Sequence, residues 1–455
     1  MTSSSSTQLV FGGKGSEIAN PVTHSALDFF ERPSVLINYE GSFDQEVFPH
    51  VGCRGPQLDF FVTADSKNCI DLNRICLGLE VTLYNPDGKD FATPNNVLFS
   101  NNTLHSLFSH VELFLNGQLI SSSNNNYHHA AFVETELTAD TTSKETWAHC
   151  QGYKYRGSTK KSLEIKDRLM DKFSTGGKCT LQLYGAPHVD FLDCERLLLP
   201  GVTLHLRFYR SPNNCALETL TSLDEEVVKS LDQNPPVVII ERASLFVNKI
   251  VLSDAVKVSI ERALTKSSAV YPYIENLSKS FIIQAGQNCF VKENVFGTEP
   301  IRRITMCMVR NRYFRGATLA ASPFCYEKFD LQKVELQRGN GLPIAGTPID
   351  TTNNSRLYYN TISALGFERS GNGITIEDYE DNHFFLVFDL TSTREASKSL
   401  TLFPELTGAG LTLKLSFAKA LPEAVELFLI GERFSQVCID SARNISKNSL
   451  LTTNG

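Results

Sequence analysis

Hydrophobic and polar residues alternate along most of this chain. Apolar side chains occupy every second position from Ile75 to Leu83, with Cys76, Gly78, Glu80 and Thr82 between them. Side chains with a period of two lie on opposite faces of a β-strand. The same alternation recurs at residues 58–62, 202–208, 411–417 and 425–429. Many short strands separated by Gly, Pro and Asn are typical of a β-sandwich or barrel.

Helical periodicity is scarce by comparison. The best candidate is Asp254–Leu264, in which Val256, Ile260 and Leu264 share one face and Ser253 precedes the first turn. Serine is a favoured residue immediately before a helix, because its hydroxyl can accept a hydrogen bond from a free backbone N–H. We therefore predict a nearly all-β chain with a few short helices in its loops.

Two stretches of the sequence occur twice in the same order. Residues 201–208 resemble residues 410–417, and residues 111–113 resemble residues 334–336. Each Val-Glu-Leu segment leads to an Asn-Gly pair, which favours a tight hairpin turn because both residues adopt positive φ readily. A tyrosine-containing segment then follows in each half, at residues 127–137 and 358–366. These matches predict an internal duplication.

The duplication implies a boundary near the middle of the chain. Residues 212–236 contain prolines and acidic residues, and two successive prolines at Pro235 and Pro236 cannot continue a strand ladder. We therefore predict five segments along the sequence. They are an N-terminal arm at 1–33, a first β-sandwich at 34–212, a linker at 213–236, a second β-sandwich at 237–441 and a C-terminal tail at 442–455.

Composition narrows the class of protein. The net charge of −7 and the isoelectric point near 5.9 argue against a protein that coats nucleic acid, which needs a cationic surplus. The 30 Phe and 14 Tyr against one Trp favour β structure. The eleven cysteines include no C-x-x-C pair, which favours buried free thiols. The polar first 16 residues do not resemble a signal peptide, and no apolar run is long enough to span a membrane.

The sequence offers little support for catalysis, a metal site or a cofactor. No H-x-H pair occurs among the ten histidines, and the adjacent His128 and His129 would face different directions. The acidic cluster at residues 377–381 follows Thr375, which with Asp378 predicts a helix cap rather than a pair of catalytic carboxylates. Nucleophile-elbow, phosphate-loop and dinucleotide motifs are absent from the sequence. We expect neither an enzyme nor a bound cofactor.

The sequence does not decide the role of two basic segments. Residues 154–172 are rich in Lys and Arg, and the second segment lacks acidic residues between its five arginines, Arg302, Arg303, Arg310, Arg312 and Arg315. At strand spacing several of these side chains would lie on solvated faces. Contact with packaged DNA or with another subunit is the alternative.

Six segments, in order, carry a resemblance to a known family. They read Leu-Asp-Phe-Phe at 27–30, Leu-His-Ser-Leu-Phe-Ser-His-Val at 104–111, Asn-Gly-Gln-Leu-Ile-Ser at 116–121, Ala-Ser-Leu-Phe-Val at 243–247, Gly-Asn-Gly-Ile at 371–374 and Phe-Ala-Lys-Ala-Leu-Pro-Glu at 417–423. Over roughly residues 24–445 the chain resembles the hexon-type major capsid proteins of Polinton (Maverick) elements and adintoviruses. It departs from their pattern at Ser322, where Asn is expected, and at His128-His129, where Pro-Tyr is commoner.

The resemblance implies a double jelly roll with two tandem eight-stranded sandwiches. Three copies would form a pseudo-hexagonal capsomer that tiles an icosahedral shell, so the protein would be made in the host cell and located in the virion. Expected partners are further copies of the chain, a penton or minor capsid protein and, at most non-specifically, double-stranded DNA. No catalytic residue is needed, and the residues that we expect to matter set turns and packing: Asn116, Gly117, Asn340, Gly341, Gly201 and Gly410.

Two alternatives come from other functional classes. A carbohydrate-binding, lectin-like β-sandwich is opposed by the missing signal peptide and the single Trp, because sugar sites favour exposed aromatic residues. A jelly-roll hydrolase is opposed by the lack of an H-x-H or a paired-carboxylate motif. The fold by itself would not separate the three, since jelly rolls carry all of these functions.

Overall fold

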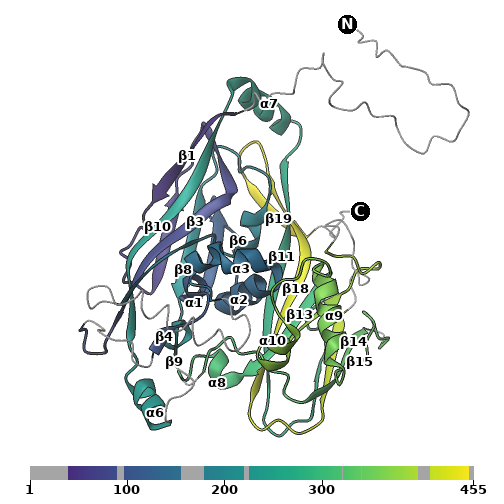
Figure 1. The fold of residues 1–455 in the computed structure, drawn as a ribbon. Helices are drawn as coiled ribbons and strands as arrows, with labels where there is room; N and C mark the ends of the chain where they lie inside the picture. The colour runs from purple at the N-terminus through teal and green to yellow at the C-terminus, as the bar shows by residue number, and fades with distance from the viewer. Residues whose placement is uncertain are drawn as a thin grey trace, which may run out of the picture. The chain divides into compact units, whose positions relative to one another are not determined.

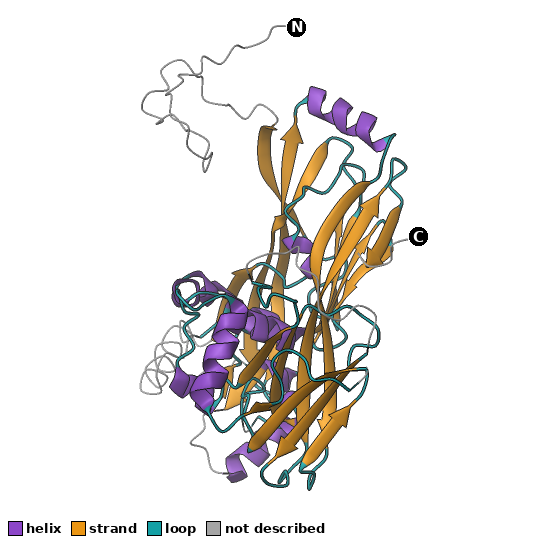
Figure 2. Ribbon diagram, turned by 90° about the vertical axis from the view of Figure 1, so that its right-hand side faces the viewer, coloured by secondary structure: helices purple, strands orange, loops and turns teal. Residues whose placement is uncertain are grey.

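The computed structural model describes residues 39–89, 97–154, 179–219, 225–319, 321–339, 341–397 and 410–449. Within these residues the chain is built mainly of β-strands, which form two sandwiches with helices in the loops (Figures 1 and 2). The predicted all-β class with two tandem jelly rolls is confirmed. No described helix is long and apolar enough to cross a membrane.

The first sandwich consists of two four-stranded antiparallel sheets. Sheet A has the order β1 (Tyr39–Val47), β10 (Val237–Leu252), β3 (Asn68–Tyr84) and β7 (Cys179–Gly185). Sheet B has the order β2 (Gln57–Val62), β8 (Leu204–Arg210), β5 (Phe108–Leu115) and β6 (Gln118–Ser122). The alternation from Ile75 to Leu83 turns its apolar side chains into the core, where each is at most 4% exposed.

The second sandwich repeats this arrangement. Sheet D has the order β11 (Ala269–Ile283), β18 (Val425–Ile439), β13 (Arg303–Arg310) and β16 (Phe385–Asp389), with β19 (Ile445–Ser449) added beside β18. Sheet E has the order β12 (Cys289–Lys292), β17 (Leu411–Phe417), β14 (Leu331–Arg338) and β15 (Ile349–Asp350). Taken in chain order, each strand of the second sandwich has the same neighbours as its counterpart in the first. Two jelly rolls of identical topology therefore lie in one chain.

The sheets do not divide where the sequence predicted. Strand β10 pairs with β3 from Val237 to Val251, so it completes the first sandwich instead of opening the second. The expected linker at 213–236 contains α5 (Asn213–Ala216), β9 (Leu217–Thr219) and α6 (Glu225–Gln233), which precede this last strand. Helix α7 (Asp254–Leu264) makes the link to the second sandwich. Pro235 and Pro236 lie in a loop within the first jelly roll. These prolines predicted the boundary between the two jelly rolls, and the predicted boundary was therefore wrong.

The predicted C-terminal tail is in part a strand of the second sandwich, because β19 extends sheet D at residues 445–449.

The two hydrophobic cores share elements across the halves of the chain. Val437 and Ile439 of β18 join the first core, and Phe132 and Leu137 join the second. This exchange of core residues ties the sandwiches into one compact unit that starts at Tyr39.

Most of the remaining elements are short. They are β4 (Val97–Phe99), α1 (Thr103–Ser106), α2 (Tyr127–Thr138), α3 (Thr141–Glu145), η2 (Trp147–Gln151), η3 (Asp190–Asp193), α8 (Asn311–Phe314), α9 (Asn354–Leu365) and α10 (Ile376–Asp381). Helix α7 has the bounds predicted from the sequence, although the Ser253 side chain makes no capping bond. Thr375 and Asp378 form the predicted cap of α10, each accepting a bond from the backbone N–H of the other.

The ladder registers refine the internal alignment. Leu113 on β5 pairs with Leu206 on β8, whereas Leu336 on β14 pairs with Leu413 on β17. The two sequence matches together would have paired Leu336 with Leu415. The shift is two residues, which keeps every side chain on its face of the sheet, so periodicity could not have detected it.

Candidate functional site

Helix α2 of the first half lies against the second sandwich and forms the joint between them. His129 stacks on Phe314 with ring centroids 3.9 Å apart, and its ring nitrogens lie 3.1 Å from the Tyr326 hydroxyl and 3.1 Å from the Phe314 carbonyl. Phe132 stacks on Phe324 at 4.5 Å. Buried aromatic pairs stabilise a contact beyond the area they bury. These contacts fix α2 on the second sandwich.

The histidines of this region are core residues. The rings of His128 and His129 lie 4.3 Å apart, and both side chains are at most 5% exposed. Burial lowers the pKa of His128 to about 4, and burial followed by the neighbouring His128 lowers the pKa of His129 well below its usual value. Burial likewise lowers the pKa of His105. All three are therefore neutral at physiological pH.

A buried ion pair joins α2 and α3 to a loop of the second half. Lys144, which is fully buried, donates to the backbone oxygen of Glu136 at 2.7 Å, to its carboxylate at 3.1 Å and to the Asn372 carbonyl at 2.8 Å. Tyr153 donates to the same carboxylate at 2.8 Å, and His383 Nε2 lies 3.7 Å from it. Burial acts to raise the pKa of Glu136, but the Lys144 charge, together with His383 and the Tyr153 hydrogen bond, outweighs it and the pKa is lowered. The carboxylate is thus held ionised inside the joint.

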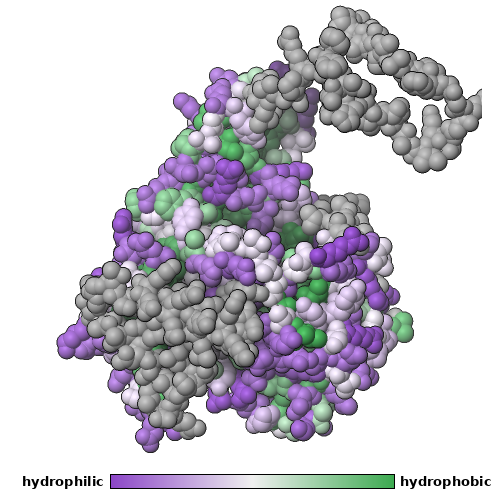
Figure 3. Space-filling model, in the orientation of Figure 1, coloured by the Kyte–Doolittle hydropathy of each residue, from purple (hydrophilic) through white to green (hydrophobic). Residues whose placement is uncertain are grey.

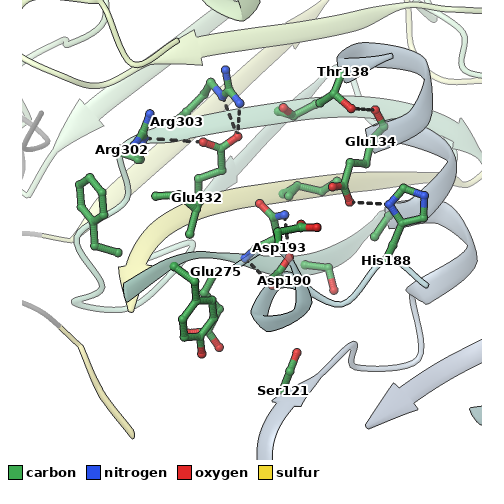
Figure 4. A pocket seen from close by; sticks show the side chains of 18 of the residues that line it. Ser121, Glu134, Thr138, His188, Asp190, Asp193, Glu275, Arg302, Arg303 and Glu432 are labelled. Carbon is green, nitrogen blue, oxygen red and sulfur yellow. Dashed lines mark hydrogen bonds and ion pairs between the residues drawn. The ribbon is translucent and has the colours of Figure 1, made fainter. Parts of the chain in front are cut away.

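Beside α2 lies a cavity of about 900 Å³, lined by α2, η3, β11, β13 and β18 (Figure 4). Its walls carry ion pairs. Glu134 of α2 lies 3.1 Å from His188, and Glu432 lies 2.5 Å from Arg303 and 3.7 Å from Arg302 (Figure 4). Burial acts to lower the pKa of His188, but Glu134 outweighs it and the pKa is raised. The cavity wall thus combines paired charges from both halves of the chain.

Two further carboxyl groups in this cavity ionise with difficulty. Asp190 accepts hydrogen bonds from the backbone N–H of Asn276 at 2.8 Å and from its side chain at 2.9 Å. Burial and then the Glu134 charge raise the pKa of Asp190 well above its usual value, and the same causes raise that of Asp193 to about 6. Groups that titrate near neutrality make the joint sensitive to pH. The described residues contain no His, Cys, Asp or Glu group arranged to hold a metal ion.

The expected turn residues lie outside this cavity. Asn116 and Gly117 have φ of 47° and 81° and form a two-residue turn between β5 and β6, and Gly341 has φ of 79°. Asn340 lies outside the described residues. The Gly341 N–H donates to the Arg338 carbonyl at 2.8 Å. Both turns begin after corresponding strands, β5 and β14, and the second is one residue longer.

The two other glycines expected from the sequence, Gly201 and Gly410, each lie beside the Asn-Gly hairpin of one sandwich. Asn116 accepts from the Thr203 N–H at 2.7 Å and donates to the Arg443 carbonyl at 2.9 Å. A Cβ at Gly201, which has φ of 83°, would lie 3.4 Å from Arg443 Nε. Arg443 also pairs with Glu261 of α7 at 2.5 Å. Arg443 thus connects the first hairpin to α7, a role that no sequence pattern around it indicated.

Gly410 occupies the corresponding place in the second sandwich. A Cβ added at Gly339 would lie 3.7 Å from the Gly410 carbonyl, so Gly410 borders the second hairpin. A Cβ at Gly410 itself would fall 1.8 Å from the Asn294 side-chain oxygen. Substitution there requires Asn294 to move, and the close approach explains the small residue.

The arginine-rich segment is neutralised within the chain. Besides the contacts of Arg302 and Arg303 with Glu432, the ion pairs are Arg310–Glu327 at 2.8 Å, Arg310–Glu423 at 2.7 Å, Arg312–Glu423 at 3.2 Å and Arg315–Glu426 at 3.3 Å. Glu423, Glu426 and Glu432 come from a segment more than 100 residues away in sequence, which begins just before β18 and continues along it. Arg312 and Arg315 lie on a solvated face, as expected for part of the segment, but each of the five arginines also pairs with a carboxylate of the chain. Apart from Lys154, the other basic segment, at residues 154–172, lies outside the described residues.

Comparison with known proteins gave results at the level of structure only. No family model and no curated protein matches the sequence. A chain of the Sputnik virophage structure determined by cryo-EM is similar over 96% of this chain and 94% of its own length, with a TM-score of 0.64 and 10% identity. The mavirus major capsid protein is similar over 97% of this chain and 98% of its own, with a TM-score of 0.57 and 9% identity.

Both similarities extend over nearly the full length of each chain, so they include both sandwiches and the joint between them. At 9–10% identity they establish architecture rather than descent or activity. Together with the strand order of sheets A, B, D and E, they identify the fold. The chain is a double jelly roll of the kind found in virophage major capsid proteins.

Proposed function

We propose that this chain is the major capsid protein of an icosahedral DNA virus or virus-like element. Three copies form a pseudo-hexagonal capsomer in this proposal. The observation that carries it is the presence of two jelly rolls with identical strand order in one chain. Three such chains supply six similar units, which suits a trimer to a six-fold position of a shell.

Further observations support a structural role. The similarity to the mavirus major capsid protein includes nearly all of both chains, and the sequence segments resemble the corresponding proteins of Polinton elements and adintoviruses. The partners that follow are further copies of the chain and a penton or minor capsid protein. Contact with packaged DNA would be non-specific and weak, since the net charge is −7 and the arginines of β13 and α8 are paired with carboxylates.

Size-exclusion chromatography with light scattering tests the assembly directly. The purified protein is expected to elute with about three times the 50.6 kDa mass of one chain at micromolar concentration. Negative-stain images should then show triangular or hexagonal particles. A monomer over the whole concentration range in physiological salt would contradict the proposal. DNA affinity, measured in parallel, should fall steeply as salt rises.

A further inference from the structure

Helices α2 and α9 occupy corresponding places in the two sandwiches. Each follows the Asn-Gly hairpin and precedes the outer strand of the other sheet, β7 for α2 and β16 for α9. Both helices have twelve residues. Aligned end to end, Phe132 and Tyr359 are both the sixth residue, and His129 and Arg356 are both the third. The two helices can therefore be compared residue by residue.

Helix α2 covers the outer face of sheet D. Phe132 is 2% exposed and stacks against Phe324, while His129 lies over Phe428 of β18 with centroids 5.9 Å apart. The outward side chains beneath it are buried as well: Thr305 is 8% exposed, Phe428 1% and Ile430 8%. These outward side chains of sheet D are buried because helix α2, which belongs to the other sandwich, packs on them.

In the described part of the chain, the corresponding surfaces at the two ends of this arrangement carry exposed aromatic side chains. Tyr359 on α9 is 61% exposed, in contrast to Phe132 at the same helix position. On sheet A, Tyr184 is 46% exposed and lies 5.6 Å from the half-exposed Phe246. Between them is Gly78, where a Cβ would approach the Phe246 ring to 3.1 Å, so the two rings lie directly on the strand. Figure 3 shows hydrophobic residues reaching the surface in the region where Figure 1 places β1 and β10.

We propose that α9 of one copy packs on the outer face of sheet A of a second copy, with Tyr359 against Tyr184 and Phe246. This contact repeats between chains the contact that α2 makes with sheet D within one chain. The proposal rests on the trimer of the proposed function and names the surfaces that hold it together. Each chain contributes one α9 and one sheet A, so the contact is head-to-tail, and three such contacts would close the ring of the proposed trimer.

Charge complementarity supports this pairing. Arg356 is exposed one turn before Tyr359, on the same side of α9. On sheet A, the exposed Glu46 of β1 pairs across the ladder with Phe246, while Glu80 on the outer face of β3 lies opposite the exposed Arg242 of β10. Arg356 and Glu46 carry opposite charges, whose attraction helps to fix which surfaces meet.

Substitutions at both surfaces test the contact. Tyr359→Ala and Arg356→Glu should each raise the concentration needed for half-assembly about tenfold or more, as expected for an aromatic or arginine anchor. The double variant R356E/E46R should recover most of the loss, because it restores opposite charges across the contact. Phe61→Ala is the matched control, since Phe61 is a 48% exposed aromatic residue on sheet B of the first sandwich. Circular dichroism and the melting temperature of each variant, measured below its assembly concentration, verify folding.

A photo-crosslinking amino acid at position 359 supplies an independent readout. It should join α9 to peptides that contain Tyr184 or Phe246 of another copy, identified by mass spectrometry on the crosslinked dimer band. A wild-type trimer whose Y359A and R356E variants assemble like F61A, or whose crosslinks map elsewhere, overturns this interface and leaves the proposed function intact. A wild-type monomer overturns both.

Discussion

The buried Lys144–Glu136 pair offers the sharpest test of the joint. Lys144→Met keeps the length and most of the volume of the side chain but removes the charge and three hydrogen bonds, two to Glu136 and one to the Asn372 carbonyl. Glu136, 3% exposed, then loses its cationic partner while remaining buried. Removing one member of a buried pair typically costs about 3–5 kcal/mol, because the remaining charge is uncompensated.

The assay is urea unfolding at a fixed protein concentration, since assembly stabilises the folded state by mass action. Lys257→Met is the matched control: Lys257 pairs with Asp254 at 3.1 Å, but the Asp254 side chain is 95% exposed. Such a surface pair contributes about 0–1 kcal/mol. In the double variant K144M/E136Q the loss should shrink, because no charge is left unpaired.

The pH dependence gives a second readout of the same pair. The pKa of Glu136 is lowered in the folded state, so its stabilisation is present above the unfolded-state pKa, near 4.3, and is lost as the pH falls below it. In K144M this acid-dependent loss should be smaller, because the lowering of the pKa depends mainly on Lys144. If K144M unfolds at the same urea concentration as K257M, the joint does not depend on this pair and the reasoning is wrong.

Three further predictions concern the turns and the titrating groups. Gly117→Val and Gly341→Val should each cost about 1–3 kcal/mol in urea unfolding, because both positions have positive φ, and the double variant should be additive within error. The pKa of His128 is lowered to about 4, so the folded state takes up fewer protons and stability falls as the pH drops from about 6.5 towards 4. His128→Leu should flatten this part of a melting-temperature profile against pH, and an unchanged slope would contradict the assignment. The pKa of Asp193 is raised to about 6, so its neutral form stabilises the fold at low pH, and this contribution is lost as the pH rises. Asp193→Asn should therefore raise the melting temperature more at pH 8 than at pH 5.

The local pattern was sufficient for the strands. Alternation from Ile75 to Leu83 predicted which face of β3 is buried, because a pleated strand with period two leaves no other solution. Asn116 and Gly117 adopt positive φ between β5 and β6, and the 254–264 periodicity placed α7 with its correct bounds. These features depend on interactions between residues close together in sequence, where side-chain chemistry alone restricts the backbone.

The sequence did not show which distant strands pair with each other. Nothing in Val237–Leu252 itself distinguishes a first strand of the second sandwich from a last strand of the first, because either ladder satisfies its backbone groups and its apolar face. The two-residue difference between the β5–β8 and β14–β17 registers was invisible for the same reason.

The joint and its charges also required the tertiary structure. The sequence did not decide whether His128 and His129 lie on the surface or in the core, and α2 places both in an aromatic core. The arginines of the acid-free segment pair with carboxylates more than 100 residues away, on β18 and just before it, and Arg310 also pairs with the nearer Glu327. Sequence determined the period of each strand and the position of each turn, since these are local. Only the fold decided which strands pair and which charges meet, because those contacts join residues brought together by packing.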